Sequence, residues 1–189
     1  MRILFQSRIV TLLVFAVSAA SAQTRYSGPR TSDGKPDLNG IWQALNTANW
    51  DLAPHAAIGG NIVSLGAQGA EPGGLGVVEG GPIPYLPEAL KKKQENYARR
   101  FTDDPEIKCY MPGVPRATYQ PFPFQIVQSS RFILMSYEFA NASRQIYLGA
   151  PPEGDDSWMG TSAAHWDGDV LIVETGGFVD RTWFDRAGD

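Results

Sequence analysis

The stretch TSAAHWDGDVLIVE, residues 161–174, decides the fold class. At its centre lies the pair Asp167-Gly168, which is preferred in the type I′ turn of β-hairpins because both turn positions need a positive φ. We therefore predict a hairpin with this pair as its turn. The predicted turn sets the cross-strand pairs Trp166–Asp169, His165–Val170 and Thr161–Glu174.

Side chains on the two strands of this hairpin alternate between two faces. One face carries Ser162, Ala164, Trp166, Asp169, Leu171 and Val173, and the other carries Thr161, Ala163, His165, Val170, Ile172 and Glu174. The second strand is apolar on both faces, which predicts cover on both sides of the sheet. This pattern favours a barrel or a sandwich over a sheet with one wet face.

Apolar runs upstream predict further strands, at 40–45, 124–128, 131–139 and 143–148. Short connections favour antiparallel neighbours, so we predict a mainly β domain. Its strands form an antiparallel meander that makes a barrel-like or sandwich domain. If residues 140–142 are a loop, Glu138 faces Arg144, and such a cross-strand pair contributes about 0.2–1 kcal/mol.

One amphipathic helix is predicted at residues 87–101. Pro87 suits the first turn of a helix, and Leu90, Tyr97 and Phe101 fall on one face at helical spacing. We expect that face to pack against the sheet from outside. The preceding residues, 46–87, hold nine glycines and form a long excursion over the surface. Connections of this length are uncommon unless they are functional or disordered.

The N-terminus has the pattern of an export signal. Arg2 and Arg8 form a basic n-region before an apolar run at residues 9–19, and Ala20-Ser21-Ala22 is a small-residue cleavage site. The run is too short for a membrane-spanning helix, which needs about 20 residues. We predict an exported protein, periplasmic or secreted, with residues 1–22 removed. Residues 23–189 then form one β-rich domain with no membrane span after cleavage.

The predicted mature chain is acidic. Removing Arg2 and Arg8 leaves 14 of the 16 Lys and Arg residues against 20 Asp and Glu residues, a formal charge of −6. Proteins that bind nucleic acid carry a concentrated basic surface, so we expect no nucleic-acid partner. The glycines lack nucleotide-binding spacing, and the two histidines are far apart in sequence. We expect no cofactor and no metal.

His165 is the candidate catalytic residue. In the predicted register it shares a face with Glu174 but lies four positions from it, roughly 13 Å at the usual rise of a strand. The two side chains cannot form a direct hydrogen bond at that separation. An exported hydrolase or lyase would therefore use His165 with a more distant carboxylate and with Arg116 or Arg144. The alternative interpretation is a cross-strand residue without a catalytic role.

Aromatic residues give a second hypothesis for function. The candidate ligand-binding residues are Trp42, Trp158, Trp166, Tyr137, Arg116 and Arg144. The rings would line a cavity for a small apolar or aromatic ligand, and the arginines would face an anionic group. Core packing is the alternative for each ring, and ion pairing is the alternative for each arginine. A third hypothesis is a structural or interaction domain of the cell envelope.

Several motifs resemble a large group of uncharacterised exported bacterial proteins. They are DGKPDLNGIW at 33–42, GPIPYLPEA at 81–89, CYMPGVPR at 109–116, and WMG at 158–160 followed by HWDGDVLIVET at 165–175. The resemblance covers nearly all of the predicted mature chain and implies export, without implying a particular activity. Similar sequences continue beyond the position equivalent to Gly188. The resemblance therefore predicts that this chain is a truncated form.

Overall fold

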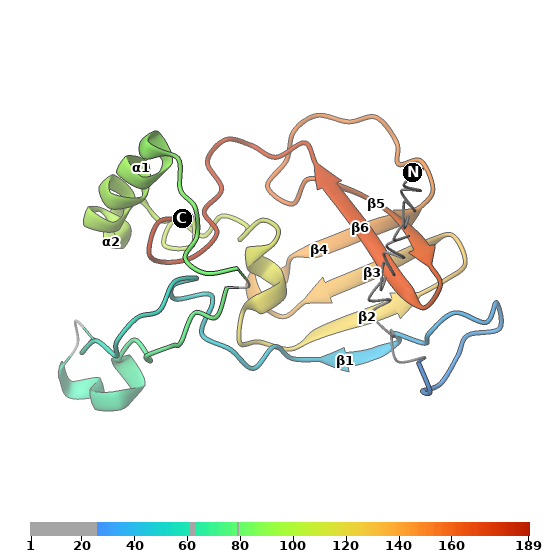
Figure 1. The fold of residues 1–189 in the computed structure, drawn as a ribbon, viewed down its shortest axis with the longest axis horizontal. Coiled ribbons are helices and arrows are strands. Elements are labelled where there is room, and N and C mark those ends of the chain that lie inside the picture. Colours follow the sequence, from blue (N-terminus) through green and yellow to red (C-terminus); the bar gives the residue numbers. More distant parts are fainter. Residues whose placement is uncertain (1–25, 61–62, 79) are drawn as a thin grey trace, which may run out of the picture.

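A computed structural model of the protein describes residues 26–60, 63–78 and 80–189 (Figure 1). The fold is mainly β, as predicted. Its strands form one sheet in the order β1-β2-β3-β4-β5-β6. They are β1 (Gly40–Trp42), β2 (Phe124–Gln128), β3 (Phe132–Tyr137), β4 (Ser143–Leu148), β5 (Thr161–Asp167) and β6 (Val170–Gly176). The predicted signal peptide, 1–22, lies outside the described residues.

One strand pair departs from the predicted antiparallel meander. β4 and β5 are parallel, with Ile146 opposite Ser162 and Leu148 opposite Ala164. A parallel neighbour requires the chain to cross back along the sheet, and residues 149–160 make that return. Tight-turn motifs in a sequence indicate antiparallel hairpins only. The crossover from β4 to β5 has no such motif, so the sequence did not predict it.

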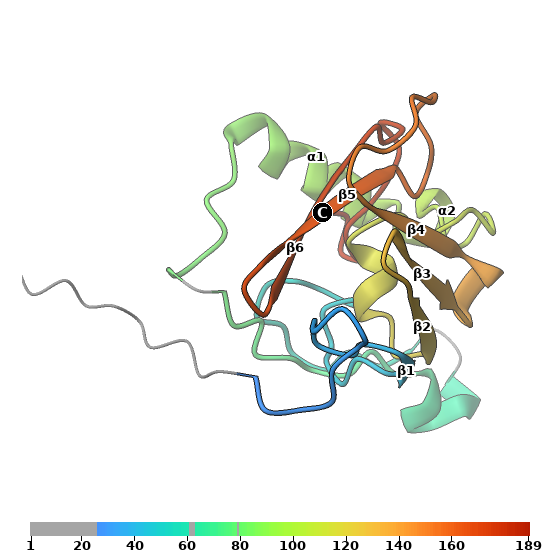
Figure 2. The same cartoon turned by 90° about the vertical axis from the view of Figure 1, so that its right-hand side faces the viewer.

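The described strands do not close into a barrel, so β1 and β6 are the edges of a curved sheet (Figure 2). The segment 26–38, which folds back on itself through an antiparallel bridge between Arg30 and Pro36, contacts the sheet near both edges. Arg30 Nη1 lies 2.7 Å from Asp169 Oδ1 at the tip of the β5–β6 hairpin. At its other end, the backbone N–H of Leu38 donates to Oε1 of Gln128 on β2, at 2.8 Å. β1 and β6 are therefore not paired with each other, and the segment 26–38 contacts the sheet near both through side chains.

The β5–β6 hairpin exists, but its turn is one residue further along than predicted. Asp167 pairs with Val170 and His165 with Ile172, so Gly168 and Asp169 form the turn. Gly168 has a φ of 59° and takes the first position, where type II′ turns require glycine. Because the partner of each residue moves by two positions, every side chain keeps its predicted face.

The core lies on one face of the sheet only. Ile133, Met135 and Ile146 are buried there, together with Ala117 and Met159 from the connections. The prediction that both faces of β6 are covered is wrong, because Val170 and Ile172 are 39% and 37% exposed. A run of β-branched residues suits a strand whether or not its outer face is covered. The apolar pattern therefore predicts the position of the strand better than it predicts whether both of its faces are buried.

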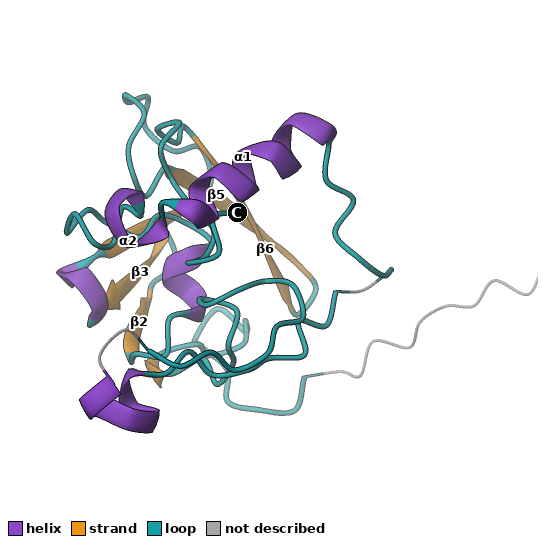
Figure 3. Cartoon of the chain, turned by 90° about the vertical axis from the view of Figure 1, so that its left-hand side faces the viewer, coloured by secondary structure: helices purple, strands orange, loops and turns teal. Residues whose placement is uncertain are grey.

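The predicted helix is present but breaks at Arg99, whose φ is −112°. It forms α1 (Pro87–Ala98) and α2 (Arg100–Asp103), which lie beyond one end of the sheet (Figures 1 and 3). The expected packing face is wrong, since Leu90, Tyr97 and Phe101 are 42%, 39% and 49% exposed. The buried residue of α1 is Asn96. Three 3₁₀ segments complete the described elements: η1 (Val63–Gly69), η2 (Arg116–Tyr119) and η3 (Phe139–Asn141).

None of the described helices is both long enough and apolar enough to cross a membrane.

Candidate functional site

The segment 180–189 joins the helices to the glycine-rich excursion. Trp183 and Asp185 are 8% and 0% exposed. Asn96 Nδ2 on α1 donates to the carbonyl of Gly188 at 3.0 Å. On the other side, the backbone N–H of Leu52 donates to Asp185 Oδ2 at 2.8 Å. Cavities form around this segment, away from the core face of the sheet.

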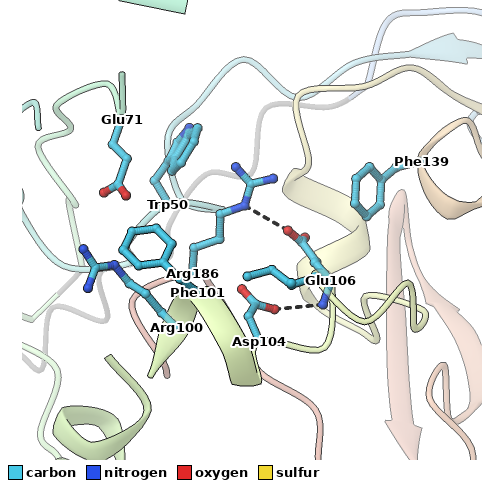
Figure 4. A pocket seen from close by; sticks show the side chains of 9 residues that line it. Trp50, Glu71, Arg100, Phe101, Asp104, Glu106, Phe139 and Arg186 are labelled. Carbon is cyan, nitrogen blue, oxygen red and sulfur yellow. Dashed lines mark hydrogen bonds and ion pairs between the residues drawn. The ribbon is translucent and has the colours of Figure 1, made fainter. Parts of the chain in front are cut away.

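One of these cavities, the Trp50 pocket, has a volume of about 350 Å³ (Figure 4). Trp50 and Phe101 lie on one side of it and Phe139 on the other (Figure 4). A second hollow of about 270 Å³ shares Trp50, Phe101, Arg100 and Glu71 with it and is also lined by residues of the excursion. The two cavities are therefore neighbours, and the excursion forms part of their walls.

The polar floor of the Trp50 pocket is neutralised by ion pairs within the protein. Both terminal nitrogens of Arg116 donate to the Asp104 carboxylate, at 2.8 and 2.9 Å. Arg116 Nε lies 3.0 Å from Glu106 Oε1 in an ion pair that lacks hydrogen-bond geometry. Arg186 Nε donates to Glu106 Oε2 at 2.9 Å. Since the carboxylates of Asp104 and Glu106 are buried and paired with arginines, their role is structural. They are not free to act as bases or metal ligands.

Two arginines lie against the aromatic walls. The guanidinium carbon of Arg186 is 4.3 Å from the centre of the Trp50 ring, and that of Arg100 is 4.3 Å from the centre of the Phe101 ring. Such cation–π contacts hold each ring in place. Arg100 Nε is buried and has no hydrogen-bond partner within the described ranges. An unsatisfied buried donor costs about 1–3 kcal/mol.

Three carboxylates meet beside the segment 180–189. Oxygens of Asp51, Asp185 and Asp189 lie within 4.8 Å of one another. Lys93 is already among them, with Nζ 2.5 Å from Asp189 and 3.4 Å from Asp51. Burial, reinforced by the neighbouring Asp189, raises the pKa of Asp185 to about 7. Burial lowers the pKa of Lys93, but the bonds to Asp189 and Tyr85 outweigh it and leave the pKa raised. The cluster is an internal ion-pair network, and we assign no metal to it.

The residues that the sequence nominates do not form one site. Trp42, Tyr137, Arg144 and Trp166 share the core face of the sheet, because the register alternates them onto it across β1, β3, β4 and β5. None of these four residues lines the Trp50 pocket, the hollow beside it or the cavity that contains Trp158. Trp158 lines a separate cavity beyond α2. Arg116 does not line the Trp50 pocket but lies buried behind its carboxylates, Asp104 and Glu106.

His165 lies on the opposite, solvent-exposed face of β5. Because Ala163 pairs with Glu174, His165 and Glu174 are two positions apart rather than four, roughly 7 Å along the ladder. The predicted separation of roughly 13 Å was therefore wrong. Arg144 projects from the other face, so His165 and Arg144 cannot act on the same substrate.

Arg144 has a different environment from the one predicted. It lies opposite Met135, not Glu138, because η3 lengthens the connection between β3 and β4. Its side chain is buried and donates to Ser162 Oγ at 2.9 Å and to Thr175 Oγ1 at 2.6 Å. Burial lowers its pKa. The predicted Glu138–Arg144 pair is therefore wrong, and Arg144 links three strands of the core face.

Sequence reasoning missed the residues that build the Trp50 pocket. Trp50, Arg100, Phe101, Phe139 and Arg186 are widely spaced in the chain and lie largely outside the strands. The one signal available was Trp50, a large ring within a glycine-rich excursion. In comparisons with known proteins, no family model, curated protein or solved structure matches this chain. The resemblance to exported bacterial proteins stays a prediction.

Proposed function

We propose that this protein is an exported β-domain that binds a small apolar or aromatic ligand in the Trp50 pocket. The observation that supports the proposal is a cavity of about 350 Å³ with aromatic walls and a self-neutralised polar floor. Ligand pockets commonly have volumes of about 300–1,000 Å³, mostly apolar walls and a few placed polar groups. The Trp50 pocket fits that description at the small end of the range.

The chemistry of the walls favours a flat, largely neutral ligand. Trp50 and Phe101 offer faces and edges for ring stacking, worth about 0.5–1.5 kcal/mol beyond burial alone. Asp104 and Glu106 are neutralised by Arg116 and Arg186, so the floor attracts neither cations nor anions strongly. We expect a ligand with one ring system.

Binding is favoured over the hydrolase or lyase alternative by the placement of the candidate catalytic groups. His165 and Arg144 lie on opposite faces of the sheet, and Arg116 is 1% exposed and paired with two carboxylates. A general base must reach the proton that it abstracts, within about 3 Å or through one water. These three residues cannot meet that requirement together.

A fluorescence titration tests the proposal. The neutral probe N-phenyl-1-naphthylamine is added to the protein, and saturable enhancement of its emission gives a Kd. We expect Trp50→Ala and Phe101→Ala each to weaken binding tenfold or more, because each removes a wall. Trp42→Ala is the matched control, since Trp42 is 47% exposed on β1 and lines none of the cavities described here.

Circular dichroism of each variant separates loss of binding from loss of folding. Phe101 is 49% exposed, so its truncation leaves the fold intact even if that of Trp50 does not. An unchanged Kd in the folded Phe101→Ala protein would exclude the Trp50 pocket. The absence of saturable binding to the unsubstituted protein would instead favour a structural or interaction domain.

A further inference from the structure

The cavity that contains Trp158, here named the Trp158 cavity, lies beside the same short helix, α2, as the Trp50 pocket. Its volume is about 330 Å³, and the two cavities share no lining residue. α2 and its cap contribute to both. Arg100 and Phe101 line the Trp50 pocket, whereas Arg99 and Asp103 line the Trp158 cavity.

Positive charge is concentrated around the Trp158 cavity, although the predicted mature chain is acidic overall. Four cations line it, Lys92, Arg99, Lys108 and Arg181, against two carboxylates, Asp103 and Asp180. A concave site lined by one sign of charge attracts ions of the opposite sign. The local excess of positive charge therefore favours an anion.

Two of the four cations are available to a ligand. Asp103 is occupied by Arg99, at 2.7 Å, and by Lys108, at 3.9 Å. Across the described ranges, Lys92 and Arg181 form no ion pair with a carboxylate. Both side chains are exposed, so they can approach an anion without giving up an existing ion pair. Arginine also recognises carboxylate and phosphate with two parallel hydrogen bonds.

Aromatic rings form the apolar part of the same cavity. Tyr110 and Trp158 are stacked, with ring centres 4.9 Å apart and planes inclined by 19°. The guanidinium of Arg181 lies 5.4 Å from the centre of the Trp158 ring. Trp183 also lines the cavity and is 8% exposed. A flat ring and a cation are therefore adjacent, which suits a ligand with a planar ring and an anionic group.

We propose that the Trp158 cavity is a second binding site, which takes a small aromatic anion. The aromatic wall contacts the ring, and Arg181 and Lys92 bind a carboxylate or phosphate on it. This site differs from the Trp50 pocket in both lining and charge. The proposal stands whether or not the Trp50 pocket binds a neutral ligand.

Isothermal titration with three matched compounds tests this site on the full chain. The compounds are 2-naphthoate, 2-naphthyl phosphate and the neutral 2-naphthalenemethanol. We expect at least one anion to bind tenfold or more tightly than the alcohol, and the more tightly bound anion identifies the preferred head group. Raising NaCl from about 50 mM to about 500 mM is expected to weaken anion binding severalfold through screening.

Variants place the bound anion. Arg181→Gln and Trp158→Ala are each expected to weaken anion binding tenfold or more. Arg131→Gln, at an exposed arginine between β2 and β3, is expected to leave it unchanged. Equal affinity for the anions and the alcohol in the Trp50→Ala protein, in which the neutral site is weakened, would overturn the proposal. An unchanged Kd for the anion in Arg181→Gln would also overturn it. So would a result in which Trp50→Ala loses anion binding and Trp158→Ala retains it.

Discussion

Asp103 and Asp104 are sequence neighbours with opposite structural roles. The side chain of Asp104 is 3% exposed and accepts two hydrogen bonds from Arg116, which is itself buried. The side chain of Asp103 is 39% exposed and pairs with Arg99 on the helix surface. Removing one partner of a buried pair leaves an uncompensated charge, whereas an exposed pair contributes little.

We expect Asp104→Ala to lower the free energy of unfolding by about 3 kcal/mol. The change removes both hydrogen bonds of the Arg116 terminal nitrogens and leaves that buried charge with Glu106 alone, which Arg186 shares. Asp103→Ala, the adjacent control, is expected to leave stability nearly unchanged. Urea denaturation of the two variants measures both effects. Equal effects would show that the Arg116 network does not support the fold.

At the scale of elements, local sequence patterns predict the strands better than their connections. The Asp167-Gly168-Asp169 run contains two overlapping pairs that can form a turn, and the structure uses the second. The alternation of side chains survives that shift, so the faces of β5 and β6 were predictable. The parallel β4–β5 pair was not, because its cause is a long crossover. The Trp50 pocket was not predictable either, because it is formed by irregular segments that are far apart in the sequence.

Gly168 allows a direct test of the turn. Its φ is 59°, and a Cβ added to it would meet no atom within 4 Å, so a larger residue meets backbone strain without a steric clash. Gly168→Ala is expected to lower the free energy of unfolding by about 1 kcal/mol. Gly176 on β6 also has open space but no positive φ, so Gly176→Ala is the control. Similar effects of the two changes in thermal or urea denaturation would contradict the assigned turn.

For the molecule as a whole, the segment 180–189 makes stability depend on pH. The pKa of Asp185 is raised from 3.8 to about 7, chiefly by burial. The folded protein therefore holds a proton that the unfolded chain releases between these values. Stability falls wherever the folded state binds more protons and pH rises. The contribution of Asp185 is thus most favourable below about pH 4 and is lost progressively up to about pH 7.

We expect Asp185→Asn to reduce that decline, because an amide does not titrate. The measurement is the free energy of unfolding at intervals from about pH 4 to about pH 8. The comparison of slopes isolates Asp185 from the other carboxylates, even if the variant is less stable at every pH. Parallel curves for the two proteins would show that Asp185 does not titrate in this range.

The short helix α2 also has a thermodynamic consequence. With its cap, Arg99, it supplies wall residues to both the Trp50 pocket and the Trp158 cavity. A ligand that binds in one cavity and moves or rigidifies this helical turn changes the free energy of ligand binding in the other cavity. Linkage makes such an effect reciprocal, so each ligand alters the affinity of its counterpart by the same factor. If both proposed ligands bind, this single helical turn couples the two sites.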